Sequence, residues 1–221
     1  MRGRQVFMES LMAHGVDAIF GNPGTTENPL LDSLIDYPSI KYYVALQESI
    51  AMSAASFYAQ AKGLTSVVNL HVAPGLGNAI GMAFGALKAN SPVLITAGQQ
   101  DTRMRLREPL LSYDLVEMAK PVVKWSVEPR TADEMGPILS RAFKIAMTPP
   151  RGPVFVSLPV DVMSTETLVL AVNNKGQLIP PPADLDQIQG LADRLSEANA
   201  PAIIAGDDVT VYDGFDYLTK I

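Results

Sequence analysis

Five short apolar runs, separated by segments long enough to form a helix, constrain the fold of this 221-residue chain more than any other feature. Apolar runs of this length are typical of strands that are buried on both faces, as in parallel sheets. A helix-length segment between two such strands serves as a crossover connection. The chain is therefore predicted to form an α/β domain with a doubly wound, mostly parallel sheet and helices on both faces. The predicted strands are residues 17–20, 42–45, 66–71, 92–97 and 154–158.

Helical spacing of apolar residues and local stop signals place helices between these strands. Gly15 ends the first predicted helix, and Thr131–Glu134 fits a capping box that begins the last one. The glycine-rich residues 73–77 are predicted to form a loop. The predicted helices are residues 5–13, a segment from the turn at 21–26 through residue 36, then 47–61, 78–89 and 131–147.

Composition excludes several classes of protein. The 17 Lys and Arg against 23 Asp and Glu give a net charge of −6, which argues against nucleic-acid binding and against a membrane-surface protein. Without cysteine the chain has no disulfide, thiol nucleophile or thiolate metal site. It also lacks an HExxH motif, a dense carboxylate cluster and a G-x-S-x-G elbow, so we predict no metal ligand and no serine hydrolase. No apolar stretch reaches the ~20 residues of a membrane span, and a cytoplasmic location is expected.

The sequence changes character after Met163. Residues 164–183 are polar and end in Pro180-Pro-Pro182, which is typical of an extended linker. A helix at 185–198 and a strand at 202–205 then suggest the start of another α/β unit. We therefore expect a domain at residues 1–163, a linker at 164–183 and the beginning of a further domain at 184–221, too small to bury a core of its own.

The strongest candidate site residues follow predicted strands, where parallel sheets bind ligands. Glu48 opens a helix rich in Ala and Ser, so it is either a carboxylate that favours the helix dipole or a buried acid that exchanges a proton with a ligand. His71 ends a strand and is either a proton shuttle or a partner of a backbone carbonyl. His14, at the end of the first helix, suits the dipole as a cation and is expected to be structural.

Other motifs have plain structural interpretations. Gly75, Gly77 and Gly81 miss the dinucleotide fingerprint by one residue, so a tight turn is favoured over an anion site. Thr25 and Thr26 are suitable helix N-caps, although Thr25 is also able to offer its hydroxyl to a ligand. The arginines at 103, 105 and 107 are expected in a solvated loop.

Taken in order, several segments resemble the N-terminal, pyrimidine-binding domain of thiamine-diphosphate-dependent 2-oxo-acid decarboxylases and acetolactate synthases. The similarity is greatest to benzoylformate decarboxylases. It covers residues 1–163, while 184–221 resembles the start of the central domain of that family. The segments are Phe20-Gly-Asn-Pro-Gly-Thr-Thr-Glu27, Ala45-Leu-Gln-Glu48, Asn69-Leu-His71, Gly75-Leu-Gly-Asn78, Ala97-Gly-Gln-Gln100, Val123-Lys-Trp-Ser126 and Gly152-Pro-Val-Phe-Val-Ser-Leu-Pro159.

The resemblance implies roles for particular residues. The glutamate matching Glu48 hydrogen-bonds the aminopyrimidine ring of thiamine diphosphate and so promotes proton loss from C2 of the thiazolium. Asn22, Pro23 and Gly24 match the loop beside the thiazolium, and Asn78 is expected to bind the cofactor. The histidine matching His71 transfers protons and contacts substrate.

The resemblance also marks what differs and what is missing. Thr25 stands where benzoylformate decarboxylases have a serine whose hydroxyl holds the substrate carboxylate, so the particular 2-oxo acid stays open. The Gly-Asp-Gly…Asn motif that binds diphosphate and Mg²⁺ in the C-terminal domain of the family does not occur.

The sequence therefore predicts the N-terminal part of a thiamine-diphosphate- and Mg²⁺-dependent 2-oxo-acid decarboxylase, inactive as this chain alone. It would need a C-terminal diphosphate-binding domain or a partner subunit, and the family's shared site implies a homo-oligomer, at least a dimer. The alternatives are part of an acetolactate-synthase-like carboligase and a non-catalytic nucleotide- or anion-binding module. A nicotinamide oxidoreductase is a weaker alternative, because the fingerprint spacing is wrong.

Overall fold

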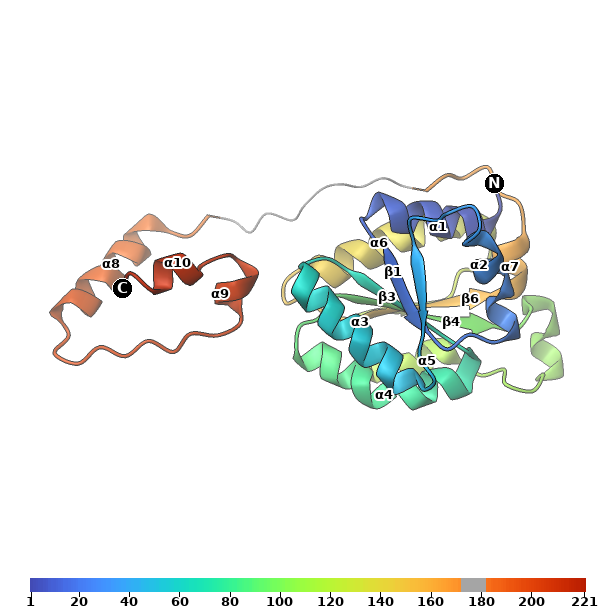
Figure 1. Ribbon diagram of the computed structural model, residues 1–221, viewed down its shortest axis with the longest axis horizontal. Helices are drawn as coiled ribbons and strands as arrows, with labels where there is room; N and C mark the ends of the chain where they lie inside the picture. The colour runs from blue at the N-terminus through green and yellow to red at the C-terminus, as the bar shows by residue number, and fades with distance from the viewer. Residues whose placement is uncertain (172–181) are drawn as a thin grey trace. The chain divides into compact units, whose positions relative to one another are not determined.

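The computed structural model describes residues 1–171 and 182–221 (Figure 1). The chain divides into two compact units, Met1–Gly176 and Gln177–Ile221, which are described separately. The domain boundaries expected from the sequence stay a prediction.

The first unit is built on a six-stranded, all-parallel sheet with the strand order β2-β1-β3-β4-β6-β5. This confirms the predicted fold class. β1 lies between β2 and β3, pairing Ile19 with Tyr42 on one side and with Val67 on the other. The strand that follows β1 in the sequence, β2, lies on one side of it, and the later strands lie on the other side. The junction of β1 and β3 is therefore the topological switch point of the sheet. The strands are β1 Ala18–Gly21, β2 Lys41–Val44, β3 Ser66–Leu70, β4 Val93–Gln99, β5 Ser126–Val127 and β6 Val154–Pro159.

Helices cover both faces of this sheet (Figure 1). Alternate strand residues face opposite layers: Val67 packs in one apolar core and Val68 in the other. Phe155 and Val156 of β6 divide in the same way. One layer holds α1 Gly3–Ala13, α2 Asn28–Ser33, α6 Met135–Met147 and α7 Val160–Ser164, and the other holds α3 Glu48–Lys62, α4 Val72–Lys88 and α5 Leu115–Ala119.

Helices α3 and α4 pack against each other through small side chains. Ala51, Ala55 and Ala59 of α3 and Ala79 and Ala83 of α4 are completely buried. Alanine lets two helix backbones approach closely, and it also has the highest helix propensity. These five alanines, called here the alanine seam, belong to the apolar core that α3 and α4 share with the sheet.

The glycine-rich loop predicted at 73–77 is wrong, because α4 begins at Val72 and runs through these residues. The chain reverses at Val72 itself, whose φ of 43° is left-handed and rare for a β-branched residue. Pro74 is tolerated because it falls in the first helical turn, where its missing N–H has no intrahelical partner. Gly75 is buried within α4, and a Cβ there would lie at an ordinary contact distance of 3.5 Å from Leu70, so this glycine makes no turn.

The two edge strands of the sheet differ from the prediction. The strand at 42–45 was expected to be buried on both faces, but β2 is an edge strand with Tyr43 and Val44 at least half exposed. β5, at the opposite edge, was not predicted because only two residues pair.

The capping box predicted at Thr131–Glu134 is wrong as well. Glu134 accepts a hydrogen bond from the backbone of Arg130, and Thr131 makes no side-chain cap. A 3₁₀ turn at Ala132–Glu134 precedes α6 instead.

The polar segment that follows α7 does not begin as a free linker. Thr167 bonds the backbone of Met1 and is buried, and Ala171 packs against the core that contains α1. Both contacts attach this segment to the start of the chain. Most of the predicted linker, including Pro180 and Pro181, lies outside the described residues.

The second unit contains α8 Leu185–Glu197, α9 Asp208–Val211 and α10 Phe215–Leu218. The predicted helix at 185–198 is confirmed, and the side chain of Asp184 caps it. The predicted strand at 202–205 is wrong: no strand forms there, and Ile203 and Ile204 are exposed. A strand needs a partner to satisfy its backbone groups, and none is present among residues 182–221.

Candidate active site

Three predicted site residues follow adjacent strands at one edge of the sheet. Asn22 follows β1, Glu48 comes four residues after β2, and His71 follows β3. The carboxyl ends of parallel strands point to the same edge, and β1 and β3 form the switch point there. The topology thus brings together residues that are up to 49 positions apart in the sequence.

Glu48 is the first residue of α3 and is only 8% exposed. Gln47 caps this helix, accepting hydrogen bonds from the backbone N–H groups of Ser49 and Ile50. Asn22 Nδ2 donates to Oε1 of Glu48 at 3.0 Å, and Asn78 Nδ2 donates to Oε2 at 2.9 Å. A buried carboxylate at a helix N-terminus is favoured by the helix dipole, and the two amide donors satisfy one position on each oxygen.

Asn78 reaches Glu48 because α4 begins immediately after β3. Its side chain lies on the second turn of α4, at the exposed edge of the site. Gly75, one turn earlier, packs beside Glu48, and a Cβ at Gly75 would lie 3.7 Å from Cγ of that residue. The glycine is therefore part of the wall behind the carboxylate.

His71 lies against a second carboxylate, that of Glu27. The Nδ1 atom of His71 is 2.7 Å from Oε2 of Glu27, and Thr26 Oγ1 is 3.3 Å from the same nitrogen. The side chain of His71 is 27% exposed, whereas that of Glu27 is 1% exposed. No hydrogen bond to His71 Nε2 occurs within the part of the chain that the structure describes, so this nitrogen is the one that can meet a ligand.

The loop after β1 contacts both Glu48 and His71. Asn22 contacts Glu48, and two residues later Gly24 lies against the ring of His71. Any Cβ at Gly24 would come within 2.4 Å of that ring, so only glycine fits here. Pro23 is half-buried between the two contacts.

Thr25 and Thr26 do not act as the predicted N-caps. The residue before the 3₁₀ turn Thr25–Glu27 is Gly24, whose N–H donates to Oε2 of Glu27 at 2.7 Å. Thr26 is buried and donates its hydroxyl to Oε1 of Glu27. Thr25 is exposed, and among the described residues its hydroxyl has no hydrogen-bond partner. The hydroxyl of Thr25 is thus open to a ligand.

Glu27 is the site residue that sequence reasoning missed. It is 2% exposed, accepts hydrogen bonds from Gly24 and Thr26, and lies 2.7 Å from Nδ1 of His71. A local signal was present, since a glutamate three residues after Gly24 matches the acidic position of a capping box. The contact with His71, 44 residues away, is tertiary and has no sequence signature.

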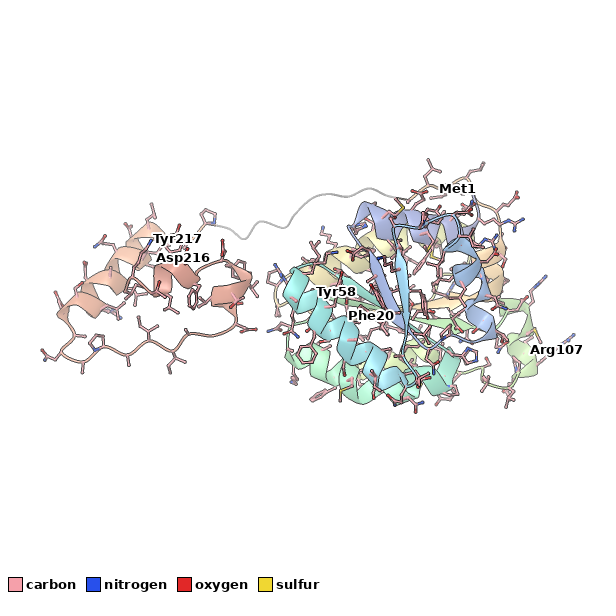
Figure 2. The ribbon with its side chains drawn as sticks, viewed as in Figure 1. Met1, Phe20, Tyr58, Arg107, Asp216 and Tyr217 are labelled. Carbon is pink, nitrogen blue, oxygen red and sulfur yellow. The ribbon has the colours of Figure 1, made fainter. Side chains whose placement is uncertain are left out.

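The two remaining candidates lie away from this site. His14 ends α1, stacks on Phe143 at 4.0 Å, and shares a hydrogen bond with the carbonyl of Ser10. Burial lowers the pKa of His14, which disfavours the cation expected at this helix end. The arginines form an exposed 3₁₀ helix, Thr102–Arg107, with Arg103 paired to Asp101 and Arg105 to Glu128. Figure 2 shows Arg107 at the outer edge of the first unit, pointing away from it.

Two kinds of feature are absent from the described residues, 1–171 and 182–221. No group of three or more His, Asp or Glu side chains there could hold a metal ion. No helix there is long and apolar enough to cross a bilayer.

Comparison with known proteins gives the family of this chain. Residues 1–118 match the family described as thiamine pyrophosphate enzyme, N-terminal TPP binding domain. The match covers more than half of the chain, and the chain belongs to this family.

Particular relatives extend the similarity beyond residue 118. Benzoylformate decarboxylase of Pseudomonas aeruginosa is 38% identical over 208 residues, covering 91% of this chain and 38% of that protein. The acetolactate synthase large subunit of Lactococcus lactis is 30% identical, covering 94% of this chain and 36% of the relative. The structure of a thiamine-diphosphate-dependent 4-hydroxybenzoylformate decarboxylase from Rhodococcus jostii RHA1 superposes with a TM-score of 0.86 at 32% identity, covering 96% of this chain and 40% of that one. The chain thus spans about two fifths of the length of the proteins it matches.

Proposed function

We propose that this chain is the N-terminal part of a thiamine-diphosphate-dependent 2-oxo-acid decarboxylase and supplies the glutamate that controls proton transfer in the cofactor. One observation carries the proposal: the carboxylate of Glu48 is buried at the switch point of the sheet, at the start of a helix, between two amide donors. The similarity to benzoylformate decarboxylase of Pseudomonas aeruginosa supports the substrate class.

The donor set at the site fits the aminopyrimidine ring of thiamine diphosphate. Each oxygen of Glu48 accepts one amide hydrogen bond and keeps a further acceptor position, so the carboxylate can also accept an N–H from such a ring. Hydrogen bonds at a buried carboxylate are stronger than in water because the local dielectric is low. Asn22 and Asn78 would hold the carboxylate in place while a ring binds.

Thiamine diphosphate, when bound, supplies the electron sink that makes loss of carbon dioxide from a 2-oxo acid feasible. The residues of this chain would then position the reactants and move protons. Glu48 would hold a proton shared with a ring nitrogen. His71, open at Nε2, would exchange a proton with the substrate, and the exposed hydroxyl of Thr25 would donate to the carboxylate of the 2-oxo acid.

The proposal includes groups beyond this chain. Ligands for Mg²⁺ and the diphosphate would come from a C-terminal domain or a partner subunit, and the working enzyme would be at least a dimer. Exposed apolar side chains on the outer side of α3, Ile50 and Phe57, support a further contact there. The chain by itself, with cofactor and Mg²⁺, should therefore decarboxylate no 2-oxo acid.

Carboligation of the acetolactate synthase type is the second candidate. It is favoured by the similarity to the large subunit of Lactococcus lactis, and the same Glu48 geometry would serve it. Product analysis with pyruvate separates the two, since a carboligase forms a new carbon–carbon bond. A nucleotide-binding module has less support, because the glycine run lies within α4 and makes no phosphate loop.

The experiment uses the polypeptide produced from the native gene, called here the native polypeptide. Its mass is measured first, and its decarboxylation of a series of aromatic and aliphatic 2-oxo acids is then compared with that of Glu48→Gln. We expect kcat to fall by about 10²–10⁴-fold, as for loss of a general acid or base. Glu128→Gln, a control outside the site, should keep its activity. Equal kcat for wild type and Glu48→Gln would refute the proposal.

A further inference from the structure

The carboxylate of Glu27 is buried more completely than that of Glu48, and the proposed chemistry leaves it without a role. Burying a carboxylate is unfavourable unless hydrogen bonds replace the lost water. Three groups that are able to donate lie within 2.8 Å of its oxygens: the backbone N–H of Gly24, the hydroxyl of Thr26 and Nδ1 of His71. Two of them are local, and the third connects Glu27 to a ring that is partly exposed in the site.

Two glycines leave room for the side chains of Glu27 and His71. A Cβ on Gly98 of β4 would lie 1.9 Å from Oε1 of Glu27 and 2.4 Å from the hydroxyl of Thr26. A Cβ on Gly24 would overlap the ring of His71. Glycine at both positions leaves room for the carboxylate on one side and for the imidazole on the other.

The geometry fixes which ring nitrogen carries the proton. An ionised carboxylate only accepts hydrogen bonds, so Nδ1 of His71 must be the donor in the 2.7 Å contact. In the neutral ring Nε2 is then left unprotonated, with its lone pair directed away from Glu27. A histidine held by an acceptor at one nitrogen is the common arrangement where the other nitrogen does chemistry.

We propose that Glu27 is a positioning residue: it holds His71 in the Nδ1–H form, so that Nε2 is the atom that exchanges a proton with the substrate. This inference rests on the proposed function for the identity of the substrate. Whether Glu27 selects the Nδ1–H tautomer of His71 does not depend on that function, and it can be measured in this chain alone.

The first test is the tautomer of His71 in the 221-residue chain, read from long-range ¹H–¹⁵N correlation spectra at alkaline pH. The chain has only two histidines, and His71→Gln assigns the signals. His14 is an internal reference, because its Nδ1 faces the carbonyl of Ser10, which also only accepts. We expect both rings in the Nδ1–H form. An Nε2–H ring at His71, the form that imidazole favours in water, would overturn the proposal without any variant.

The second test removes the acceptor. In Glu27→Ala we expect the His71 signals to move to the Nε2–H pattern, while those of His14 stay unchanged and show that the fold persists. Glu128→Ala is the matched control, since that glutamate also accepts from a buried hydroxyl, Ser157, but lies outside the site. An unchanged His71 tautomer in folded Glu27→Ala would contradict the proposal.

The third test asks whether Glu27 acts through His71 in the native polypeptide. Glu27→Ala is expected to lower kcat by about 10²-fold, the scale of a misplaced catalytic group, with a smaller change in KM. In the His71→Ala background the same change should cost nothing further, whereas multiplied losses would show an independent role. If the native polypeptide decarboxylates no 2-oxo acid, the proposed function fails. The spectra would still determine whether Glu27 selects the tautomer of His71.

Discussion

Asn22, which follows β1, and Glu48, which begins α3, meet through a hydrogen bond of 3.0 Å from Nδ2 to Oε1. Asn78 closes the other side of the same carboxylate from α4. The position of Glu48 therefore depends on how α3 packs against α4, which unfolding measurements on the chain can test.

The alanine seam between α3 and α4 should tolerate no larger side chain. Ala55→Leu adds three carbon atoms at a completely buried position, so we expect the free energy of unfolding to fall by about 1–3 kcal/mol. Urea titration followed by circular dichroism measures this loss. Ala61→Leu, at an exposed position of the same helix, should change stability by less than about 0.5 kcal/mol. Equal effects of the two substitutions would show that the seam is not tightly packed.

Removing the amide of Asn78 should weaken the fold modestly. Asn78→Ala leaves Oε2 of the buried Glu48 without its protein donor, and the usual cost of such a loss is about 1–3 kcal/mol. Water can reach this exposed position, so we expect the lower end of that range in urea unfolding. Asn28→Ala, an exposed asparagine without a side-chain hydrogen bond among the described residues, is the control. A loss no greater than that of the control would mean that the Asn78–Glu48 contact contributes nothing.

Two glycines should respond to alanine in opposite directions. Gly98→Ala places a Cβ 1.9 Å from Oε1 of Glu27, so it should destabilise the first unit and displace that carboxylate. Gly85→Ala, in α4, meets no atom within 4 Å and should raise the free energy of unfolding by about 0.5–1 kcal/mol through helix propensity. Thermal unfolding of both variants checks this, and stabilisation by Gly98→Ala would contradict the packing around Glu27.

Mild acid should destabilise the fold through His14. Burial lowers the pKa of His14 in the folded chain below its ordinary value of 6.5. The unfolded chain therefore takes up a proton at a higher pH than the folded chain does. The stability that His14 contributes is complete above about pH 6.5 and is lost as the pH falls towards the folded pKa. Urea unfolding at pH 7.5 and 5.5 should show a smaller pH-dependent loss in His14→Phe than in wild type. An equal loss in both proteins would show that His14 is not the group responsible.

Much of this architecture could be predicted because the signals are local. The apolar runs predicted β1, β3, β4 and β6, and helical spacing predicted α3, since each pattern reports burial of a continuous segment. The start of α4 could not be predicted in the same way. Glycines usually indicate a turn, but here the chain turns at Val72, and Gly75 and Gly77 lie within the helix.

The candidate site was predictable only in part for a similar reason. Glu48 and His71 stood out because each follows a strand, and the structure brings Asn22 and Asn78 to Glu48. The partner of His71 depends on a tertiary contact with Glu27 across 44 residues. The cap expected at Thr26 fails because its hydroxyl donates to the buried Glu27, and Thr25 is the first residue of the 3₁₀ turn, which Gly24 precedes.

The most direct measurement of the central claim concerns the proton that Glu48 is proposed to control. The native polypeptide is saturated with thiamine diphosphate and Mg²⁺, and exchange of the cofactor C2 proton with deuterium is timed by NMR for wild type, Glu48→Gln and the control Glu128→Gln. We expect fast exchange in wild type and in the control, and exchange slower by at least about 10²-fold in Glu48→Gln. Equally fast exchange in all three proteins would contradict it.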